Sequence, residues 1–304
     1  MTQTTPAAEP AALTGAPAQQ RLPAWRLLAA NPLTLASAIV LAVIVLLALL
    51  GPFISPYGIN EIDVSRQLQP PSAAHWFGTD DLGRDILSRV LHAIGISLLI
   101  AVCAVTFAFL VGVAFGTVAG YAGGIVDMVI SRVTDVLFAF PVLLLALAIV
   151  AIFQPGLVTT VVAIGIVYTP IFARIARGSA LSVRSSPFVQ VSQTMGTPAR
   201  TILLRHVLPN ITGPLIVQTS LSLAFAILSE AALSFLGLGI QPPTPSLGGM
   251  LFAAQGFLAQ AWWMSVFPGV TILVTALAFN LIGDGLRDVL DPRQRSLIEA
   301  RRSR

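Results

Sequence analysis

Residues 174–210 read RIARGSALSVRSSPFVQVSQTMGTPARTILLRHVLPN, a polar, arginine-bearing stretch between two hydrophobic runs. Within it, Ser186 can cap the first free amides of a short helix, and Pro187 suits the first helical position, where its missing N–H costs nothing. Gly196 can adopt the left-handed conformation that ends a helix. The stretch therefore predicts a separate short helix between two longer apolar segments.

One side of this short helix is apolar. Phe188, Val191 and Met195 recur at i, i+3 and i+7, while Gln190 points elsewhere. At about 1.5 Å per residue the helix is only about 14 Å long, too short to cross a bilayer. Such a helix either docks into a groove of another protein or lies at the lipid interface. We expect a lever for an external motor, with the interfacial helix as the alternative.

The whole chain is far more apolar than a soluble domain of its length. Of its 304 residues, 56% are hydrophobic and 10% charged, and the mean hydropathy is +0.86, which predicts an integral membrane protein. Lysine is absent, so the chain lacks the lysine that a phosphate-binding loop of an ATPase requires. The single cysteine, Cys103, excludes an intrachain disulfide. His75, His92 and His206 are too scattered to predict a metal site, and no catalytic arrangement or nucleic-acid partner is expected.

Six solidly apolar runs predict an all-α protein with six transmembrane helices rather than a barrel. The runs are at about residues 33–50, 90–119, 136–153, 157–173, 211–235 and 262–282. They form one membrane domain, residues 25–295, between a tail at 1–24 that is expected to be disordered and a basic tail at 296–304. The first run begins at an Asn31 cap and Pro32; a cleavable signal peptide is the alternative, but no cleavage site follows the run.

Arginine placement predicts the orientation of the chain. With the N-terminus inside, all but three of the 17 arginines fall in cytoplasmic segments, as the positive-inside rule requires. Both termini are therefore expected in the cytoplasm. The tryptophans fit an interfacial belt, with Trp25 inside and Trp76, Trp262 and Trp263 outside.

Two features inside the spans are candidates for packing or function. Gly112, Gly116 and Gly120 repeat every fourth residue, which predicts close approach of a second helix from this chain or from another subunit. Glu230 is the deepest ionisable residue in the spans. It either has a paired structural role or lines a pathway. Asp135, near the inner end of the third span, is expected in a solvated or mutually paired interfacial position.

Residues 80–89 predict a short helix outside the membrane. Thr79 can cap it, acidic residues suit its first turn, and Asp85 with Arg89 forms an i,i+4 pair. A solvated helix accounts for this pattern, and contact with an external partner is the alternative. The candidates for contact with a pathway or a partner are Asp80, Asp81 and Arg84.

The short helix and the residues after it resemble the cytoplasmic coupling loop of bacterial ABC importer permeases. Residues 188–196 read FVQVSQTMG and residues 206–210 read HVLPN. The loop of the family reads E-A-A, three residues, Gly, nine residues, I-x-L-P. Gly196, Leu208 and Pro209 match this register, whereas QVS stands at the E-A-A positions and His206 replaces isoleucine.

Three further stretches are similar to the C-type subunit of dipeptide and oligopeptide permeases. They are HWFGTDDLGRDILSR at residues 75–89, LSFLGLGIQPPTPS at 233–246 and GDGLRDVLDPR at 283–293. The resemblance extends from about residue 31 to residue 295. It implies the type I ABC importer permease fold, in the bacterial cytoplasmic membrane, with residues 187–195 as the coupling helix and Leu208–Pro209 transmitting its motion.

The resemblance also implies partners. They are a homologous B-type permease, two cytoplasmic ATPase subunits that hold ATP and Mg²⁺, an extracytoplasmic substrate-binding protein and membrane lipid, with no cofactor bound by this chain. The implied substrates are di- or oligopeptides, with nickel chelates and other solutes left open. Two other classes remain as alternatives: an ATP-independent secondary transporter and an accessory membrane protein.

Overall fold

The computed structural model describes residues 31–290, so the predicted tails at 1–24 and 296–304 and Trp25 lie outside the described residues. Within residues 31–290 five helices are long and apolar enough to cross a membrane, and one bent pair makes a possible sixth span. The all-α class is therefore confirmed. The helices are α2 (Pro32–Ile54), α3 (Ile86–Ala122), α4 (Gly124–Phe138), α5 (Val142–Phe153), α6 (Leu157–Arg184), α7 (Pro187–Thr194), α8 (Ala199–Ile202), α9 (Leu208–Asn210), α10 (Thr212–Phe235), α11 (Leu247–Ala254) and α12 (Trp263–Leu290), with short turns at Val64–Arg66, Leu203–Val207 and Gln255–Phe257.

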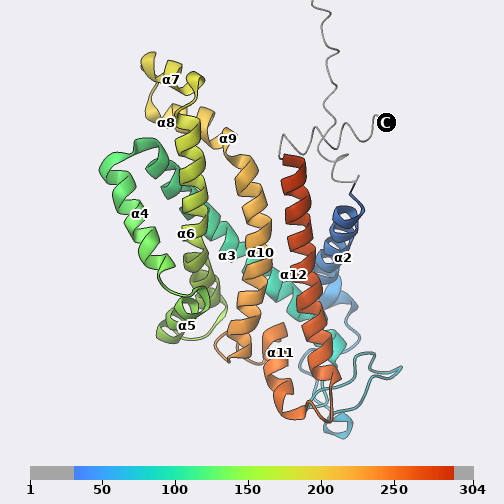
Figure 1. Cartoon of the computed structure of the whole chain (residues 1–304). Coiled ribbons are helices and arrows are strands. Elements are labelled where there is room, and N and C mark those ends of the chain that lie inside the picture. Colours follow the sequence, from blue (N-terminus) through green and yellow to red (C-terminus); the bar gives the residue numbers. More distant parts are fainter. Residues whose placement is uncertain (1–30, 291–304) are drawn as a thin grey trace, which may run out of the picture.

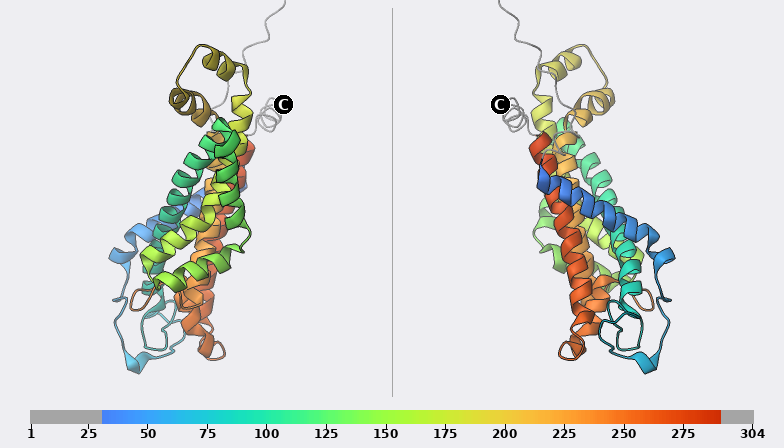
Figure 2. Two further views of the ribbon diagram at one scale, coloured as in Figure 1. Left: turned by 90° about the vertical axis from the view of Figure 1, so that its left-hand side faces the viewer. Right: turned by 90° about the vertical axis from the view of Figure 1, so that its right-hand side faces the viewer.

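The long helices form an elongated bundle. Figure 1 shows α6, α10 and α12 side by side, with α3 crossing behind them. Figure 2 shows α2 on the outside of the bundle, where it contacts α3 and α12. The helices α7 to α9 lie at one end together with the start of α2 and the end of α12; we call it the α7 end. Residues 55–85 and α11 lie at the opposite end, which we call the loop end.

The first apolar run folds as its sequence predicts. The side-chain oxygen of Asn31 accepts a hydrogen bond from the Leu33 amide at 3.0 Å, and Pro32 occupies the first turn of α2. Because the cap and the proline satisfy or remove free amides at the helix start, α2 can begin without help from its neighbours. The boundary predicted near residue 33 is confirmed.

The third predicted span, 136–153, is wrong as a single helix. The chain instead forms α4 and α5, which meet at an angle of 89°. Pro141 directly precedes α5, and a proline removes an amide donor and disfavours helical backbone at the residue before it. The 15 residues of α4 and the 12 residues of α5 span only about 22 Å and about 18 Å, so neither helix could cross a bilayer alone.

Two other spans are longer than their apolar runs. The run at 157–173 belongs to α6, which continues as one helix of 28 residues to Arg184. The polar stretch described above is therefore helical in its first third. The last run extends to Leu290 as α12, also 28 residues long. Both helices continue past their apolar runs toward the α7 end (Figure 1).

The glycine stripe of α3 packs against α6 of the same chain. A Cβ atom added at Gly112 or Gly120 would lie 2.5 Å from the carbonyl oxygen of Thr169 or Arg177, and one added at Gly116 would overlap the carbonyl of Ala173. Only glycine permits this approach of two helix backbones. Of the two predicted neighbours, a helix of this chain or one of another subunit, the stripe therefore faces a helix of this chain, α6.

Candidate functional site

The short helix α7 forms, although its cap differs from the prediction. Pro187 occupies its first position, and Gly196 has φ +74, the left-handed conformation that ends it. Ser186 stands at the cap position without a side-chain cap, because its hydroxyl donates to the Val183 carbonyl instead. The predicted capping by Ser186 is therefore wrong, and its backbone carbonyl accepts from Val189 at 3.1 Å.

The apolar side chains of α7 divide into one anchor and an exposed group. Val189 is completely buried and fixes α7 to the rest of the chain. Phe188, Val191 and Met195 are 46%, 55% and 79% exposed. These three exposed side chains form an apolar surface that no other residue of the described chain covers, and such surfaces are typical of interaction sites. We call Phe188, Val191 and Met195 the α7 face.

The residues after α7 hold it close to the bundle. Ile202 and Val207 are completely buried, and the π-helical turn Leu203–Val207 leads into α9. The Gln193 amide donates to the Tyr121 hydroxyl at the end of α3, at 3.4 Å. Leu208 and Pro209 form a single turn, α9, and α10 begins only at Thr212. The fifth span, α10, thus begins one residue after the start at about residue 211 that its apolar run predicts.

Ion pairs join α4 to α6 near the same end. Arg177 binds Asp127 through two nitrogens, with Nη2 2.7 Å from Oδ2. Arg174 lies 3.3 Å from Asp135 and 4.0 Å from the centre of the Phe138 ring. Asp135 is thus paired, which was one of its two expected roles, and its partner is Arg174.

Glu230 is a fully buried carboxyl group held by two hydroxyls. The Ser97 hydroxyl donates to Oε2 at 2.7 Å, and the Ser234 hydroxyl donates to Oε1 at 2.8 Å. Ser234 also accepts from the Ile240 amide at 3.3 Å. The carboxyl group therefore links α3, α10 and the segment after α10. These contacts favour the structural role over the pathway role.

Replacing Glu230 by glutamine should leave the fold nearly as stable, because an amide can bond both hydroxyls. Replacing it by alanine should destabilise the fold by about 3 kcal/mol, since it opens a cavity and leaves buried hydroxyls unpaired. Thermal unfolding of the purified variants in detergent measures both effects. A glutamine variant as unstable as the alanine variant would mean that the negative charge itself is required.

At the loop end, the helix predicted over residues 80–89 is wrong in its first half. The helix α3 begins only at Ile86, and Asp85 is its cap, accepting from the Ser88 amide at 2.8 Å. Asp80 Oδ1 accepts from the amides of Leu82 and Arg84, both at 2.9 Å. An aspartate that binds nearby amides in this way stabilises a turn in competition with a helix.

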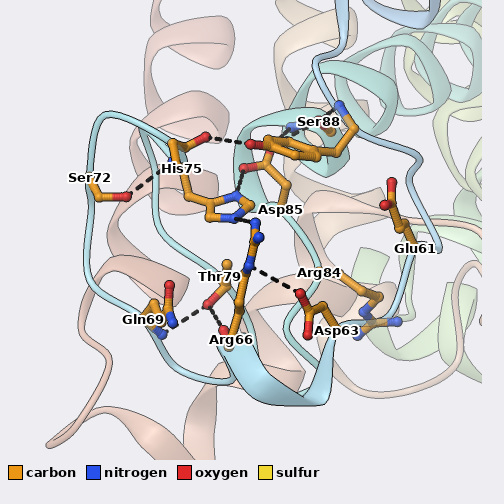
Figure 3. Close-up of polar contacts among 12 residues, drawn as sticks. Glu61, Asp63, Arg66, Gln69, Ser72, His75, Thr79, Arg84, Asp85 and Ser88 are labelled. Atoms are coloured by element: carbon orange, nitrogen blue, oxygen red, sulfur yellow. Dashed lines mark hydrogen bonds and ion pairs between the residues drawn. The ribbon is translucent and has the colours of Figure 1, made fainter.

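A buried histidine organises the loop. His75 Nδ1 lies 2.9 Å from Asp85 Oδ1, and its Nε2 lies 3.3 Å from Arg66 Nη1 (Figure 3). The centre of its ring lies 4.6 Å from that of Tyr57, with the two rings tilted by 31°. Arginine can only donate, so Nε2 accepts and Nδ1–H donates to Asp85. Asp85 is therefore paired with His75 and Ser88 rather than with Arg89. Sequence spacing gave no sign of this contact.

Replacing His75 by phenylalanine should preserve the ring contact with Tyr57 but leave a buried Asp85 oxygen without its partner. The expected cost is about 2 kcal/mol or more, because a hydrogen bond to a charged group is lost from a buried site. Limited proteolysis should then cut within residues 55–85 faster than in the unaltered protein. The His92→Phe variant is the control, since among residues 31–290 His92 bonds only the carbonyl one turn earlier in α3, at 2.9 Å. Equal cleavage of both variants would contradict the organising role of His75.

The predicted contact residues of the loop end line a cavity. This cavity, about 540 Å³ in volume, lies between the start of α3, the segment after α10 and α11. Asp80 and Arg84 lie on its wall with Arg89, whereas Asp81 lies beside Arg84, at 3.7 Å. Much of the remaining wall comes from the segment 237–246 and from α11. The sequence predicted no contact with a pathway or a partner for either of them.

The tryptophans at the loop end differ in exposure. Trp76 is 70% exposed and Trp262 53% exposed, in keeping with an interfacial position. Trp263 is buried, and its indole N–H donates to the Thr79 carbonyl at 3.1 Å. Its expected place in the belt is therefore wrong, because it joins α12 to the loop.

Two family models match the chain. Residues 112–296 match the binding-protein-dependent transport system inner membrane component, and residues 23–71 match the N-terminal transmembrane domain of oligopeptide transport permease C.

Curated relatives are similar over nearly the whole chain. The dipeptide transport system permease protein DppC of Alkalihalophilus pseudofirmus is 44% identical over 273 residues, 90% of each chain. The di/tripeptide transport system permease protein DppC of Pseudomonas aeruginosa is 42% identical over 95% of this chain and 96% of its own. The glutathione transport system permease protein GsiD of Escherichia coli is 42% identical over 88% of this chain and 89% of its own.

A solved structure shares the fold. A chain of the inward-facing MetNI methionine ABC transporter superposes with a TM-score of 0.56 at 15% identity, covering 67% of this chain and 96% of its own.

Proposed function

The chain belongs to the family of binding-protein-dependent transport system inner membrane components, and we propose that it forms half of the path by which an ATP-driven importer carries short peptides across the bacterial cytoplasmic membrane. The observation that carries this proposal is the 44% identity to a dipeptide transport permease over 90% of both chains. Relatives named for D,D-dipeptides, di- and tripeptides, and glutathione support the same substrate class. Short peptides are therefore favoured over nickel chelates.

The energy for transport comes from separate subunits. The chain contains no lysine and so lacks the residue that a phosphate-binding loop needs. We infer two cytoplasmic ATPase subunits that hold ATP and Mg²⁺, a second, homologous permease, and an extracytoplasmic binding protein that delivers the peptide. The α7 face is the surface that the ATPase would cover, because three exposed apolar side chains on one short helix suit a groove.

The orientation follows from the charges at the α7 end. The final turns of α6 and the segment after α7 carry Arg174, Arg177, Arg184, Arg200 and Arg205. An excess of arginine is typical of the cytoplasmic side. The α7 end therefore faces the cytoplasm, and the loop end faces the binding protein.

Transport proceeds by alternating access. When ATP closes the two ATPase subunits, α7 moves with the groove that holds it, and α6 moves with α7 because only residues 185–186 separate them. The glycine contacts then carry the motion to α3. Rigid-body displacement of such packed helices opens the path on one side and closes it on the other.

Reconstitution tests the proposal. The chain is inserted into liposomes together with its partner permease and ATPase subunits, and uptake of radiolabelled dialanine and glutathione is measured with the binding protein outside and ATP inside. Uptake should require all components. Full uptake without the ATPase would identify a secondary transporter, and undiminished uptake without this chain would identify an accessory protein; either result contradicts the proposal.

A further inference from the structure

The loop-end cavity has on its wall a buried cation that no carboxylate of residues 31–290 approaches within hydrogen-bond distance. Arg89 is only 7% exposed and lines the cavity. Within residues 31–290 its Nη1 donates to the Ile59 carbonyl at 2.8 Å and to Asn60 Oδ1 at 3.5 Å, and Nε and Nη2 make no hydrogen bond. Its nearest carboxylate oxygen, Asp80 Oδ2, lies 3.8 Å from Nε, beyond hydrogen-bond distance.

Asp80 makes no hydrogen bond to Arg89, because its two oxygens already accept hydrogen bonds from Arg84 and from the amides of the turn. Its Oδ1 accepts two amides, and its Oδ2 accepts from Arg84 Nε at 2.7 Å. Arg84 also faces Asp81 at 3.7 Å. The two aspartates are thus committed chiefly to Arg84, and Arg89 keeps guanidinium donors that a further carboxylate could engage. A buried charge without a hydrogen-bonded counter-ion is costly, so an anionic ligand would gain from this position.

The rest of the cavity suits a small, partly apolar molecule. Ile86, Met250 and Met264 supply apolar wall, and Thr244 and Gln241 lie at an exposed rim. The volume of about 540 Å³ is in the range of pockets that bind small ligands. A guanidinium on the wall of a largely apolar cavity can recognise a carboxylate attached to a small apolar body.

We propose that the loop-end cavity binds the terminal carboxylate of a short peptide, with Arg89 as its anchor. This proposal rests on the proposed function. It adds a peptide-binding site on the permease itself, at the loop end, where the binding protein would deliver the peptide. Arg84 is the positioning residue. Its hydrogen bond to Asp80 Oδ2 uses the carboxylate nearest to Arg89 and so leaves the Arg89 guanidinium free to bind the peptide carboxylate.

The test measures binding to the assembled transporter in nanodiscs without the binding protein. Equilibrium dialysis compares radiolabelled dialanine with dialanine amide, which lacks the carboxylate charge. The unaltered transporter should bind dialanine about 10-fold or more tightly than the amide, as expected when a charge-assisted hydrogen bond is lost from a buried site. Arg89→Gln should remove this preference, and Arg89→Lys should keep part of it.

Two further variants separate binding from folding. Arg66→Gln is the matched control: it removes an arginine from the same loop that does not line the cavity, and it should retain the preference. Ala253→Trp keeps Arg89 but places a large ring at an exposed position of the cavity wall, and it should weaken dialanine binding without loss of thermal stability.

Equal binding of dialanine and its amide by the unaltered transporter would overturn the proposal. An unchanged preference for dialanine in Arg89→Gln, or undiminished dialanine binding by Ala253→Trp, would also overturn it. Displacement by phosphatidylglycerol with no preference for dialanine would assign the cavity to a lipid headgroup and also overturn it. ATP-dependent uptake is measured in parallel. Normal uptake without a carboxylate preference contradicts only the cavity assignment, whereas absent uptake contradicts the proposed function.

Discussion

Phe188→Asp should lower ATP-dependent uptake by about 100-fold, because a central apolar anchor of an interface is typically worth about 2–4 kcal/mol. Phe188 is 46% exposed on the α7 face. It is the second residue of α7, where a negative charge favours the helix dipole. The substitution should therefore leave α7 folded while placing a charge in the proposed contact with the ATPase. Uptake into liposomes and co-purification of the ATPase with the tagged chain measure the effect.

The control for this variant is Gln193→Glu. It adds the same charge to α7 at an exposed position that contacts Tyr121 of the same chain. Uptake should stay within about threefold of normal, as surface substitutions usually change free energies by no more than about 0.5 kcal/mol. Undiminished uptake by Phe188→Asp would contradict the docking role of α7, and α7 would then be an interfacial helix.

Gly116→Leu should prevent stable folding. The new side chain would overlap the backbone of Ala173 in α6, and a backbone cannot move aside without separating α3 from α6 along the whole stripe. Overpacking of a tight contact costs about 1–3 kcal/mol, and an overlap with backbone should exceed the upper value. The amount of monodisperse protein recovered from membranes and its melting temperature measure the loss.

Gly178→Leu is the matched control, because Gly178 lies on α6 and a Cβ there meets nothing within 4 Å. Leucine also favours helix over glycine by about 0.8 kcal/mol, so this variant should be as stable as the original or more stable. Equal loss of protein in both variants would mean that the α3–α6 contact is not as close as described.

Much of the fold could be predicted because the decisive signals are local. The cap at Asn31 and the continuous apolar runs define α2, α10 and α12 without knowledge of their neighbours. The break between α4 and α5 was missed because Pro141 stands within an apolar run, and hydropathy does not register an 89° bend. The end of α6 was missed for the opposite reason, since its last turns are polar yet helical.

The candidate site divides in the same way. The helix α7 was predicted from Pro187 and Gly196, whose effects act within one turn. Its anchor Val189 was not predicted, because burial there depends on how α7 lies against the bundle. At the loop end, the turn at Asp80 and the pairing of His75 with Asp85 replace a helix that propensity alone favoured. Such contacts become visible only when the chain is folded.

The glycine contacts also determine where the bundle can bend. Because α3 and α6 touch backbone to backbone at three successive turns, the two helices act as one beam of high stiffness. The compliance of the structure is then concentrated where regular hydrogen bonding is interrupted, at the corner between α4 and α5 and in the π-helical turn before α9. A displacement of one end of the α3–α6 pair is therefore transmitted to the other end with little deformation of the two helices.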